Sequence, residues 1–255
     1  DVCSSDWLVP SPVSGGGVVL LCAPKGSPIY AIRAGLAGLL GDADLAWKSG
    51  KVREITSDVP TPAFYDGDFF VLSDLRKALA RVAPASGEVK WITPTPGRAK
   101  YEASPLAADG KIVVGGLFTL LSGIGRNYLG RFNANGTLDG SFNPGANASV
   151  LGLAIQSDGK LITVGNFSNL AGSARTFIGR LSVDQPTGQS LTADRGKVTW
   201  LCSGPGPEFW WVNFEFSNDG INFGYPAGGY RVEGGWVTDD LGLQFDENIY
   251  VRIRG

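Results

Sequence analysis

Four aspartates stand directly before a glycine, and their type and spacing come closest to metal chemistry. They are Asp66, Asp109, Asp158 and Asp219. A carboxylate at such a turn either accepts hydrogen bonds from nearby backbone N–H groups or serves as an oxygen ligand for calcium. None of these turns has the D-x-[DN]-x-[DN]-G density of a calcium loop, and Asn133-Ala134-Asn135-Gly136 with Asp139 comes nearest. We therefore expect these residues to stabilise turns, and no metal site is predicted.

Nucleophilic catalysis is disfavoured by the residue types present. The chain contains no histidine, which removes the Ser-His-Asp and Cys-His systems and every His-ligated metal site. The three cysteines, Cys3, Cys22 and Cys202, allow at most one disulfide and leave a thiol that no histidine can activate. We therefore predict that the protein is not an enzyme and has no catalytic or cofactor-binding residues.

Charge and hydropathy limit the kinds of partner. The net charge is −2 and the pI is about 5.2, and no basic stripe stands out, which argues against nucleic acid. The longest apolar run, residues 18–23, is far shorter than the roughly 20 residues of a spanning helix, so membrane insertion is not predicted. Since methionine is absent, we expect a fragment, a processed product or a trimmed chain without a signal peptide.

One aromatic strand carries the candidate contact surface for a ligand or partner. Residues 210–216 alternate, with Trp210, Val212, Phe214 and Phe216 on one face. The other face carries Trp211, Asn213 and Glu215. An exposed tryptophan at that position can stack on a sugar ring or a partner surface. The interpretation that we favour is an aromatic ring that shields a strand edge or a domain junction.

The elements that must position these side chains are revealed by a repeat with a constant offset of 49 residues (158 − 109). A repeat of this length is typical of stacked or circular architectures. Because its basic residues recur, we expect them to form ion pairs between blades or to pack their stems. The first copy has the signature Asp109, Gly110, Lys111, Phe118, Arg126 and Arg131. The second copy has Asp158, Gly159, Lys160, Phe167, Arg175 and Arg180.

A looser repeat occupies the first hundred residues. Each unit begins with a Ser/Thr-Pro dipeptide, continues through a glycine turn into an apolar strand, and two units end in a tryptophan, Trp47 or Trp91. The Asp-Gly turns suit two-residue hairpins. Strand, turn, strand and a β-rich tail are typical of one propeller blade. The units begin at Ser11-Pro12, Thr61-Pro62 and Ser104-Pro105.

These motifs carry resemblances to known families. Residues 9 to about 112 resemble the PQQ-binding-like β-propeller repeat, through Ser27–Arg33 and the run Ala85-Ser86-Gly87-Glu88-Val89-Lys90-Trp91. That resemblance implies that Trp47 and Trp91 pack between neighbouring blades. PQQ enzymes also use a vicinal cysteine pair, a calcium-bound Glu/Asn pair and an aspartate base. Adjacent cysteines are absent here, so PQQ with calcium is only the alternative to our prediction of no cofactor.

The 49-residue repeat, about residues 106–181, resembles the delta-60, DUF5122-type propeller repeat. The motif is DGK(I/L), then G-x-F, then R-x-x-(L/I)-(G/A)-R. Residues 190–255 are similar to the β module that often follows such repeats. The two propeller families meet at Asp109, and Asp1–Asp6 resembles the translation of a sequencing-adapter oligonucleotide. Two origins stay open: a metagenomic fragment or assembly chimera, and a natural hybrid propeller.

The predicted fold is all-β, a partial β-propeller of about four blade-like units followed by a small β-sandwich-like domain. Residues 1–8 are expected to be a non-native or disordered N-terminus. Residues 9–105 are predicted to form two PQQ-like blades, residues 106–185 two delta-60-type blades, and residues 190–255 a truncated β-sandwich-like module. Because an unclosed propeller leaves sheet edges and blade faces open, we also expect marginal solubility or self-association.

The function that these features predict is binding rather than catalysis. We expect an extracytoplasmic scaffold that binds a protein or a glycan. The family resemblance implies a periplasmic, cell-surface or secreted location. Two alternatives stay open: a fragment of a quinoprotein (PQQ-dependent) dehydrogenase-like propeller, and a purely structural repeat of a large surface protein.

Overall fold

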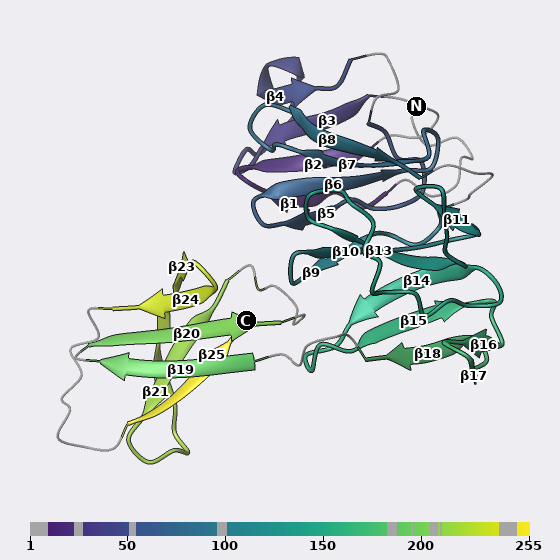
Figure 1. Ribbon diagram of the computed structural model, residues 1–255. Helices are drawn as coiled ribbons and strands as arrows, with labels where there is room; N and C mark the ends of the chain where they lie inside the picture. Colours follow the sequence, from purple (N-terminus) through teal and green to yellow (C-terminus); the bar gives the residue numbers. More distant parts are fainter. Residues whose placement is uncertain are drawn as a thin grey trace. The chain divides into compact units, whose positions relative to one another are not determined.

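Figure 1 shows the computed structural model, which describes residues 10–22, 28–50, 55–95, 101–182, 188–194, 196–204, 209, 211–239 and 249–255. The chain divides into two compact units. Unit 1 comprises Asp1–Ile155 and Lys160–Ser182, and unit 2 comprises Gln156–Gly159 and Val183–Gly255. The N-terminus predicted for residues 1–8 lies outside the described residues.

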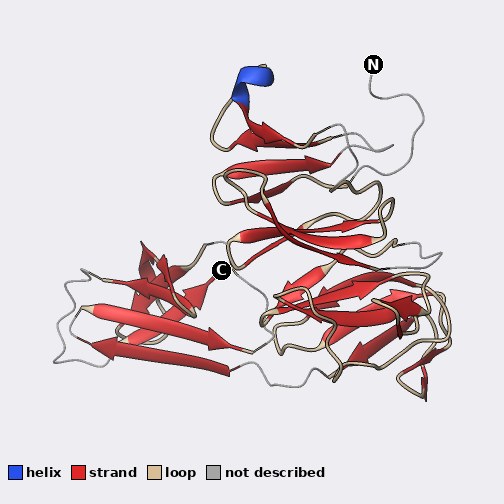
Figure 2. Cartoon of the chain, turned by 45° about the horizontal axis from the view of Figure 1, so that its top comes forward, coloured by secondary structure: helices blue, strands red, loops and turns tan. Residues whose placement is uncertain are grey.

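Regular structure in the described ranges is β, apart from the 3₁₀ turn η1 (Asp42–Asp44), as Figure 2 shows. Within these ranges, no helix has the length and apolar character needed to cross a membrane. The turn η1 follows the loop at residues 34–40 and leads directly into a strand that begins at Leu45.

Two four-stranded antiparallel sheets begin unit 1, and we call them blades 1 and 2. Each strand pairs with the preceding strand of the chain, which is the meander of a propeller blade. Blade 1 consists of β1 (Val13–Gly15), β2 (Val18–Cys22), β3 (Ile29–Arg33) and β4 (Leu45–Lys48). Blade 2 consists of β5 (Ala63–Tyr65), β6 (Asp68–Ser73), β7 (Ala78–Val82) and β8 (Val89–Pro94).

Blades 3 and 4 are three-stranded sheets, each with a separate small hairpin. Blade 3 consists of β9 (Leu106–Ala108), β10 (Lys111–Gly115) and β13 (Leu129–Asn133), with the hairpin of β11 (Leu120–Leu121) and β12 (Ile124–Gly125). Blade 4 consists of β14 (Val150–Ile155), β15 (Leu161–Gly165) and β18 (Ile178–Leu181), with the hairpin of β16 (Asn169–Leu170) and β17 (Ser173–Ala174). An antiparallel bridge from Phe132 to Leu138 occupies the fourth-strand position of blade 3.

The turn residues explain the register of the first hairpins. Asp66-Gly67 and Asp109-Gly110 each connect two strands by a two-residue turn, and all four residues have φ between 48° and 74°. Both central residues of a type I′ turn require positive φ, which Asp tolerates and Gly adopts without strain. The turn at Asp158 differs, because Ile155 pairs with Leu161 and five residues lie between them.

The core of unit 1 lies between successive sheets. Strand β6 is buried on both faces, so its sequence is continuously apolar from Phe69 to Leu72 rather than alternating. Phe69 and Val71 pack against blade 1, whereas Phe70 and Leu72 pack against blade 3. Figure 1 shows the four sheets following one another in chain order within this unit.

Unit 2 has two antiparallel sheets that enclose one core of Val198, Trp200, Val212, Phe214 and Trp236. One sheet has the order β19 (Gly188–Asp194), β20 (Lys197–Ser203), β24 (Gly235–Thr238) and β23 (Tyr230–Val232). The other has the order β22 (Gly224–Gly228), β21 (Asn213–Ser217) and β25 (Tyr250–Arg254). The prediction of an all-β chain with blade-like sheets and a small sandwich-like domain is therefore confirmed.

Candidate functional site

Each of the two repeat tryptophans lies in a seam between neighbouring blades. The indole N–H of Trp47, in blade 1, donates to the carbonyl oxygen of Pro84 in blade 2 at 2.6 Å. The indole N–H of Trp91, in blade 2, donates to the carbonyl oxygen of Ala134 in blade 3 at 3.0 Å. In both seams the tryptophan of one blade therefore reaches the turn that follows the third strand of the next blade.

The Ser/Thr-Pro dipeptides form a second set of bonds between blades. The backbone N–H of Ser11 donates to Oγ1 of Thr61 at 3.0 Å, and the N–H of Thr61 donates to Oγ of Ser104 at 3.0 Å. Each hydroxyl lies at the start of the first strand of its blade, where the following proline has no N–H to contribute. These residues link three successive blades, a role that their sequence repeat did not reveal.

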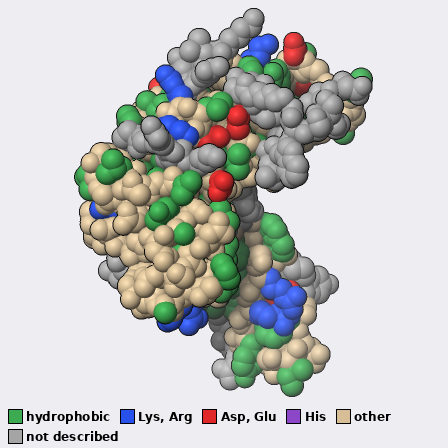
Figure 3. Space-filling view, turned by 90° about the vertical axis from the view of Figure 1, so that its right-hand side faces the viewer, with side chains coloured by type: hydrophobic (Ala, Val, Ile, Leu, Met, Phe, Trp, Pro, Cys, Tyr) green, Lys and Arg blue, Asp and Glu red, His purple; other side chains and the backbone are tan. Residues whose placement is uncertain are grey.

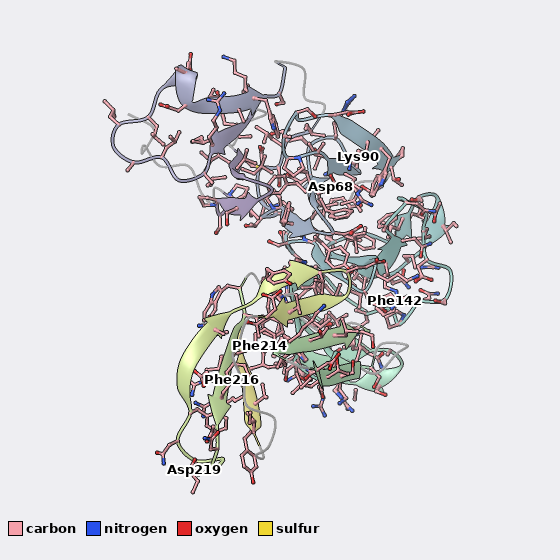
Figure 4. All side chains as sticks on the ribbon, turned by 90° about the vertical axis from the view of Figure 1, so that its left-hand side faces the viewer. Asp68, Lys90, Phe142, Phe214, Phe216 and Asp219 are labelled. Atoms are coloured by element: carbon pink, nitrogen blue, oxygen red, sulfur yellow. The ribbon has the colours of Figure 1, made fainter. Side chains whose placement is uncertain are left out.

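A buried carboxylate organises the charges of blade 2. Oδ2 of Asp68 accepts from Nε of Arg81 at 2.6 Å and from Nζ of Lys90 at 2.7 Å. Figure 4 shows Asp68 and Lys90 close together on this blade. The guanidinium of Arg81 also reaches the more exposed carboxylate of Asp66 at 3.1 Å. Asp66 therefore both begins a hairpin turn and contributes to an ion-pair network.

Blade 3 has a similar network centred on Asp139. Its Oδ2 lies 2.9 Å from Nε of Arg131 and 3.2 Å from Nζ of Lys111, and its Oδ1 accepts from the backbone N–H and hydroxyl of Ser141. Burial opposes ionisation of this carboxyl. The hydrogen bonds from Ser141 and Lys111 and the charge of Arg131 outweigh burial and hold the pKa of Asp139 well below its usual range.

The second copy of the repeat lacks the carboxylate that lies at the centre of this network. The position 49 residues after Asp139 is Gly188, which has no carboxylate. Arg126 and Arg131 are buried in blade 3, whereas the equivalent Arg175 and Arg180 are exposed in blade 4. The basic residues of the repeat therefore share a sequence position but not a common environment.

The remaining members of the repeat signature lie in turns and cores. Phe118 and Phe167 are buried in both copies. Asp109-Gly110 forms a two-residue turn, and the N–H of Gly110 donates to the hydroxyl of Tyr65 in blade 2 at 2.8 Å. Asp158, Gly159 and Lys160 lie in the five-residue connection before β15.

The run nearest to a calcium loop is a hydrogen-bonded turn. Oδ1 of Asn133 accepts from Nζ of Lys111 at 2.6 Å, and Oδ1 of Asn135 accepts from the backbone N–H of Thr137 at 3.1 Å. The carboxylate of Asp139 faces Arg131 rather than the two asparagine side chains. Among the described residues, no three His, Cys, Asp or Glu side chains gather in a metal-binding group.

The outer face of one sheet in unit 2 carries a compact set of charged groups. Oε2 of Glu215, on β21, lies 2.5 Å from Nη2 of Arg252 and 3.3 Å from Nε of Arg254, both on β25. The guanidinium of Arg252 also lies over the ring of Phe223, with 4.1 Å between its Cζ and the ring centroid. With two arginines and one glutamate, this face has an excess of positive charge.

Of the three residues predicted to contact a ligand, Asn213 and Glu215 lie on this face, and Trp211 lies just before the strand that carries them. Asn213 pairs with Arg254, and Glu215 pairs with Arg252, in the register of β21 and β25. Trp211 lies before β21, which begins at Asn213 rather than at Trp210 as the sequence alternation predicted. Trp210 lies outside the described residues. The side chain of Trp211 is 57% exposed, whereas Val212 and Phe214 on either side of Asn213 are buried in the core.

Figure 3 shows one face of the molecule, on which hydrophobic side chains and a group of Lys and Arg side chains are exposed. Trp211, Tyr230 and Tyr250 are the exposed aromatic residues of unit 2 among those described. An exposed aromatic ring can contact the apolar part of a ligand, and arginine guanidinium groups can contact its anionic part.

Asp219 and Cys22 have shifted pKa values, but hydrogen bonds within a turn explain the shift of Asp219 and burial explains that of Cys22. Asp219 accepts from the backbone N–H groups of Asn222 and Ile221 and from the hydroxyl of Ser217, and these bonds lower its pKa. Figure 4 shows Asp219 at the far end of its hairpin from Phe214. Burial raises the pKa of the Cys22 thiol to about 12, which keeps it protonated at neutral pH.

Comparison with known proteins bears on blades 3 and 4. Residues 107–142 and 156–184 match the family model described as "Domain of unknown function (DUF5122) beta-propeller". These two segments are similar to DUF5122 β-propeller repeats. The match confirms the DUF5122 resemblance expected for residues 106–181, whereas the PQQ-binding-like resemblance of residues 9–112 stays a prediction. No curated protein matches the chain in sequence.

Several solved structures are similar to the chain at low sequence identity. The computationally designed Ika4 protein is 11% identical, with a TM-score of 0.48 over 72% of this chain and 96% of that one. The quinohemoprotein alcohol dehydrogenase from Comamonas testosteroni is 12% identical, with a TM-score of 0.46, and the match covers 90% of this chain but 40% of the dehydrogenase. BamB from Moraxella catarrhalis is 12% identical, with a TM-score of 0.33 over 76% of this chain and 66% of that one. No functional conclusion follows from these similarities.

Proposed function

We propose that the chain is a non-catalytic, extracytoplasmic β-propeller repeat protein that acts as an interaction scaffold. In this proposal unit 2 binds a protein or a glycan through Trp211 and the outer face that carries Asn213 and Glu215. The observation that supports it is the exposure of the Trp211 indole immediately before the strand whose outer face carries Glu215, Arg252 and Arg254.

The chemistry of this surface favours recognition rather than reaction. A large exposed indole provides apolar contact area with little loss of conformational entropy, and it stacks on the flat face of a sugar ring or on a partner side chain. The arginines supply N–H donors for hydroxyl or carboxylate oxygens. Glu215 holds Arg252 in place through the 2.6 Å bond to its Nε, so part of the donor set is oriented before a ligand arrives.

A glycan array tests whether this surface binds a glycan. The chain is applied to a glycan array in parallel with the Trp211→Ala variant, because removing the indole should abolish or strongly weaken any specific signal. Phe177→Ala is the matched control, since it removes a similarly exposed aromatic ring from unit 1. A signal lost in the Trp211 variant alone supports glycan binding through this surface. Equal signals in all three proteins contradict a role for Trp211.

The quinoprotein alternative is tested by adding PQQ and calcium to the protein. A scaffold should leave the cofactor absorbance spectrum unchanged. Stoichiometric binding with a shifted spectrum would overturn the non-catalytic assignment, whatever the array shows.

A further inference from the structure

The outer face of blade 4 is exposed where the equivalent face of blade 3 is buried. We define it by Ile162, Val164, Ile178 and Arg180, which form two cross-strand pairs of β15 and β18. The residues 49 positions earlier, in the same pairing, are Val113, Gly115, Leu129 and Arg131. Leu129 is 0% exposed and Arg131 4%, whereas Ile178 is 58% exposed and Val164 38%. The repeat therefore places apolar residues on a face that the described part of unit 1 leaves largely exposed.

The blade 3 face shows what kind of element fits such a surface. Strand β14, the first strand of blade 4, lies against it, and its Val150 occupies the space above Gly115. A Cβ atom at Gly115 would lie 2.5 Å from Cγ1 of Val150, so the two strands are closely packed. At Gly115 the occupant of this face is therefore the first strand of the next blade, whereas Arg131 is covered by Asp139 and Phe142, which precede that strand in the chain.

Blade 1 has the complementary unpaired face. Its residues Val19, Leu21, Tyr30 and Ile32 form two cross-strand pairs and are only half-buried. The matching pairs in blade 2 are fully buried against blade 1: Phe69 with Val82, and Val71 with Ala80. In Figure 1 the sheets of blades 1 and 4 lie at the two ends of unit 1.

We propose that the blade 4 face of one copy docks onto the blade 1 face of a second copy of this chain. One chain carries two apolar blade faces, one on blade 4 and one on blade 1. The equivalent faces of blades 3 and 2 pack against a neighbouring blade, whereas these two are more exposed in the described part of the chain. Two such contacts in a two-fold dimer satisfy all four faces and give a ring of eight blades, which is within the range of closed propellers. Burial of the apolar face supplies the driving force.

The first measurement is the mass of the full chain by size-exclusion chromatography with light scattering across a concentration series. The expected species has twice the mass of one chain. Ile178→Glu places a carboxylate in the contact and should raise the concentration needed for dimerisation at least ten-fold. Ile221→Glu makes the same chemical change at an exposed position of unit 2 and should leave the mass unchanged. Circular dichroism of each variant establishes that it is folded.

A mixing experiment identifies the two faces that meet. Tyr30→Glu on the blade 1 face should also give a monomer when it is alone. Mixing it with Ile178→Glu should restore a dimer, because the intact blade 4 face of the first variant meets the intact blade 1 face of the second. A blade 4 to blade 4 contact would leave Tyr30→Glu dimeric on its own, and that result would overturn the proposal. A wild-type chain that stays monomeric at all concentrations, or that forms open-ended polymers, would overturn it as well.

Discussion

The indole N–H of Trp91 donates a hydrogen bond to the carbonyl oxygen of Ala134, 3.0 Å away in the next blade. Trp47 makes the equivalent bond to Pro84 one blade earlier. In the Trp91 seam, Thr93 adds a bond from its hydroxyl to the carbonyl of Gly136 at 2.7 Å. Because both tryptophans lie on the last strand of their blade, the contact is a repeated device that fixes one blade to the next.

Replacing Trp91 by Phe should destabilise the protein by about 1 kcal/mol, because the ring contact with Phe70 is largely retained but the carbonyl of Ala134 loses a donor. Urea unfolding followed by circular dichroism measures the change. Trp211→Phe is the control, since its exposed side chain should change the free energy of unfolding by no more than about 0.5 kcal/mol. Equal effects of the two substitutions would contradict a bonding role for the Trp91 indole.

Two glycines allow the cost of backbone strain to be compared with the cost of steric crowding against Trp47. Gly67 and Gly87 have nearly the same φ, 74° and 73°, but only Gly87 lies against the Trp47 ring. Substituting Ala at Gly67 should cost roughly 1–2 kcal/mol, because an L-residue is strained at that φ. Ala at Gly87 should cost more, since its Cβ would lie 2.6 Å from the indole. Thermal melts of both variants make the comparison, and a smaller effect at Gly87 would contradict the tight seam.

The two copies of the repeat predict opposite results for the same substitution. Arg131→Ala should destabilise the protein by about 3–5 kcal/mol, because it removes the partner that lies 2.9 Å from the buried Asp139 carboxylate. Arg180→Ala, at the equivalent position that is exposed within one chain, should change the free energy of unfolding of the monomer by less than about 0.5 kcal/mol. Urea unfolding of the two variants measures the difference. Both variants are measured at a protein concentration at which the chain is monomeric, and similar losses there would contradict the exposure of Arg180 within one chain.

This contrast shows what the sequence could and could not predict. The 49-residue offset and the Asp-Gly turns indicate blades and their hairpins, because turn geometry and strand pairing are local. Arg131 and Arg180 look alike in the repeat, yet one is buried and the other exposed. Arg131 contacts Asp139 and Phe142, which follow in the same copy, whereas the equivalent positions of the second copy are Gly188 and Leu191. The conserved spacing of the arginines does not show this difference in their partners.

The candidate contact surface of unit 2 could be predicted from the sequence to a smaller extent. Alternation along 210–216 places Asn213 and Glu215 opposite Phe214, which the burial of Phe214 matches. The arginines that pair with Glu215 come from β25, 37 residues further along the chain for Arg252. Their register depends on how the sheet of unit 2 assembles. The sequence therefore predicts which side chains share a strand face, but not which charges they meet across it.

Stability should fall at alkaline pH through two buried groups of unit 1. Burial raises the pKa of Tyr101 to about 12 from an ordinary value of 10, and burial raises that of Cys22 to about 12 from 9. Because each pKa is higher in the folded state, the neutral group stabilises the protein below its ordinary pKa. This contribution declines as pH rises from about 9 and is lost by about pH 12.

Tyr101→Phe isolates one part of this dependence. The variant loses the hydrogen bond from the Tyr101 hydroxyl to the carbonyl of Thr95, at 3.1 Å, so it should be about 1 kcal/mol less stable at pH 7. Its stability should then fall less steeply than that of the wild-type protein above pH 10, because the variant has no phenol whose ionisation favours the unfolded chain. Urea unfolding at a series of pH values up to 11.5 or so measures both slopes. Parallel slopes would show that the hydroxyl of Tyr101 reaches solvent in the folded protein.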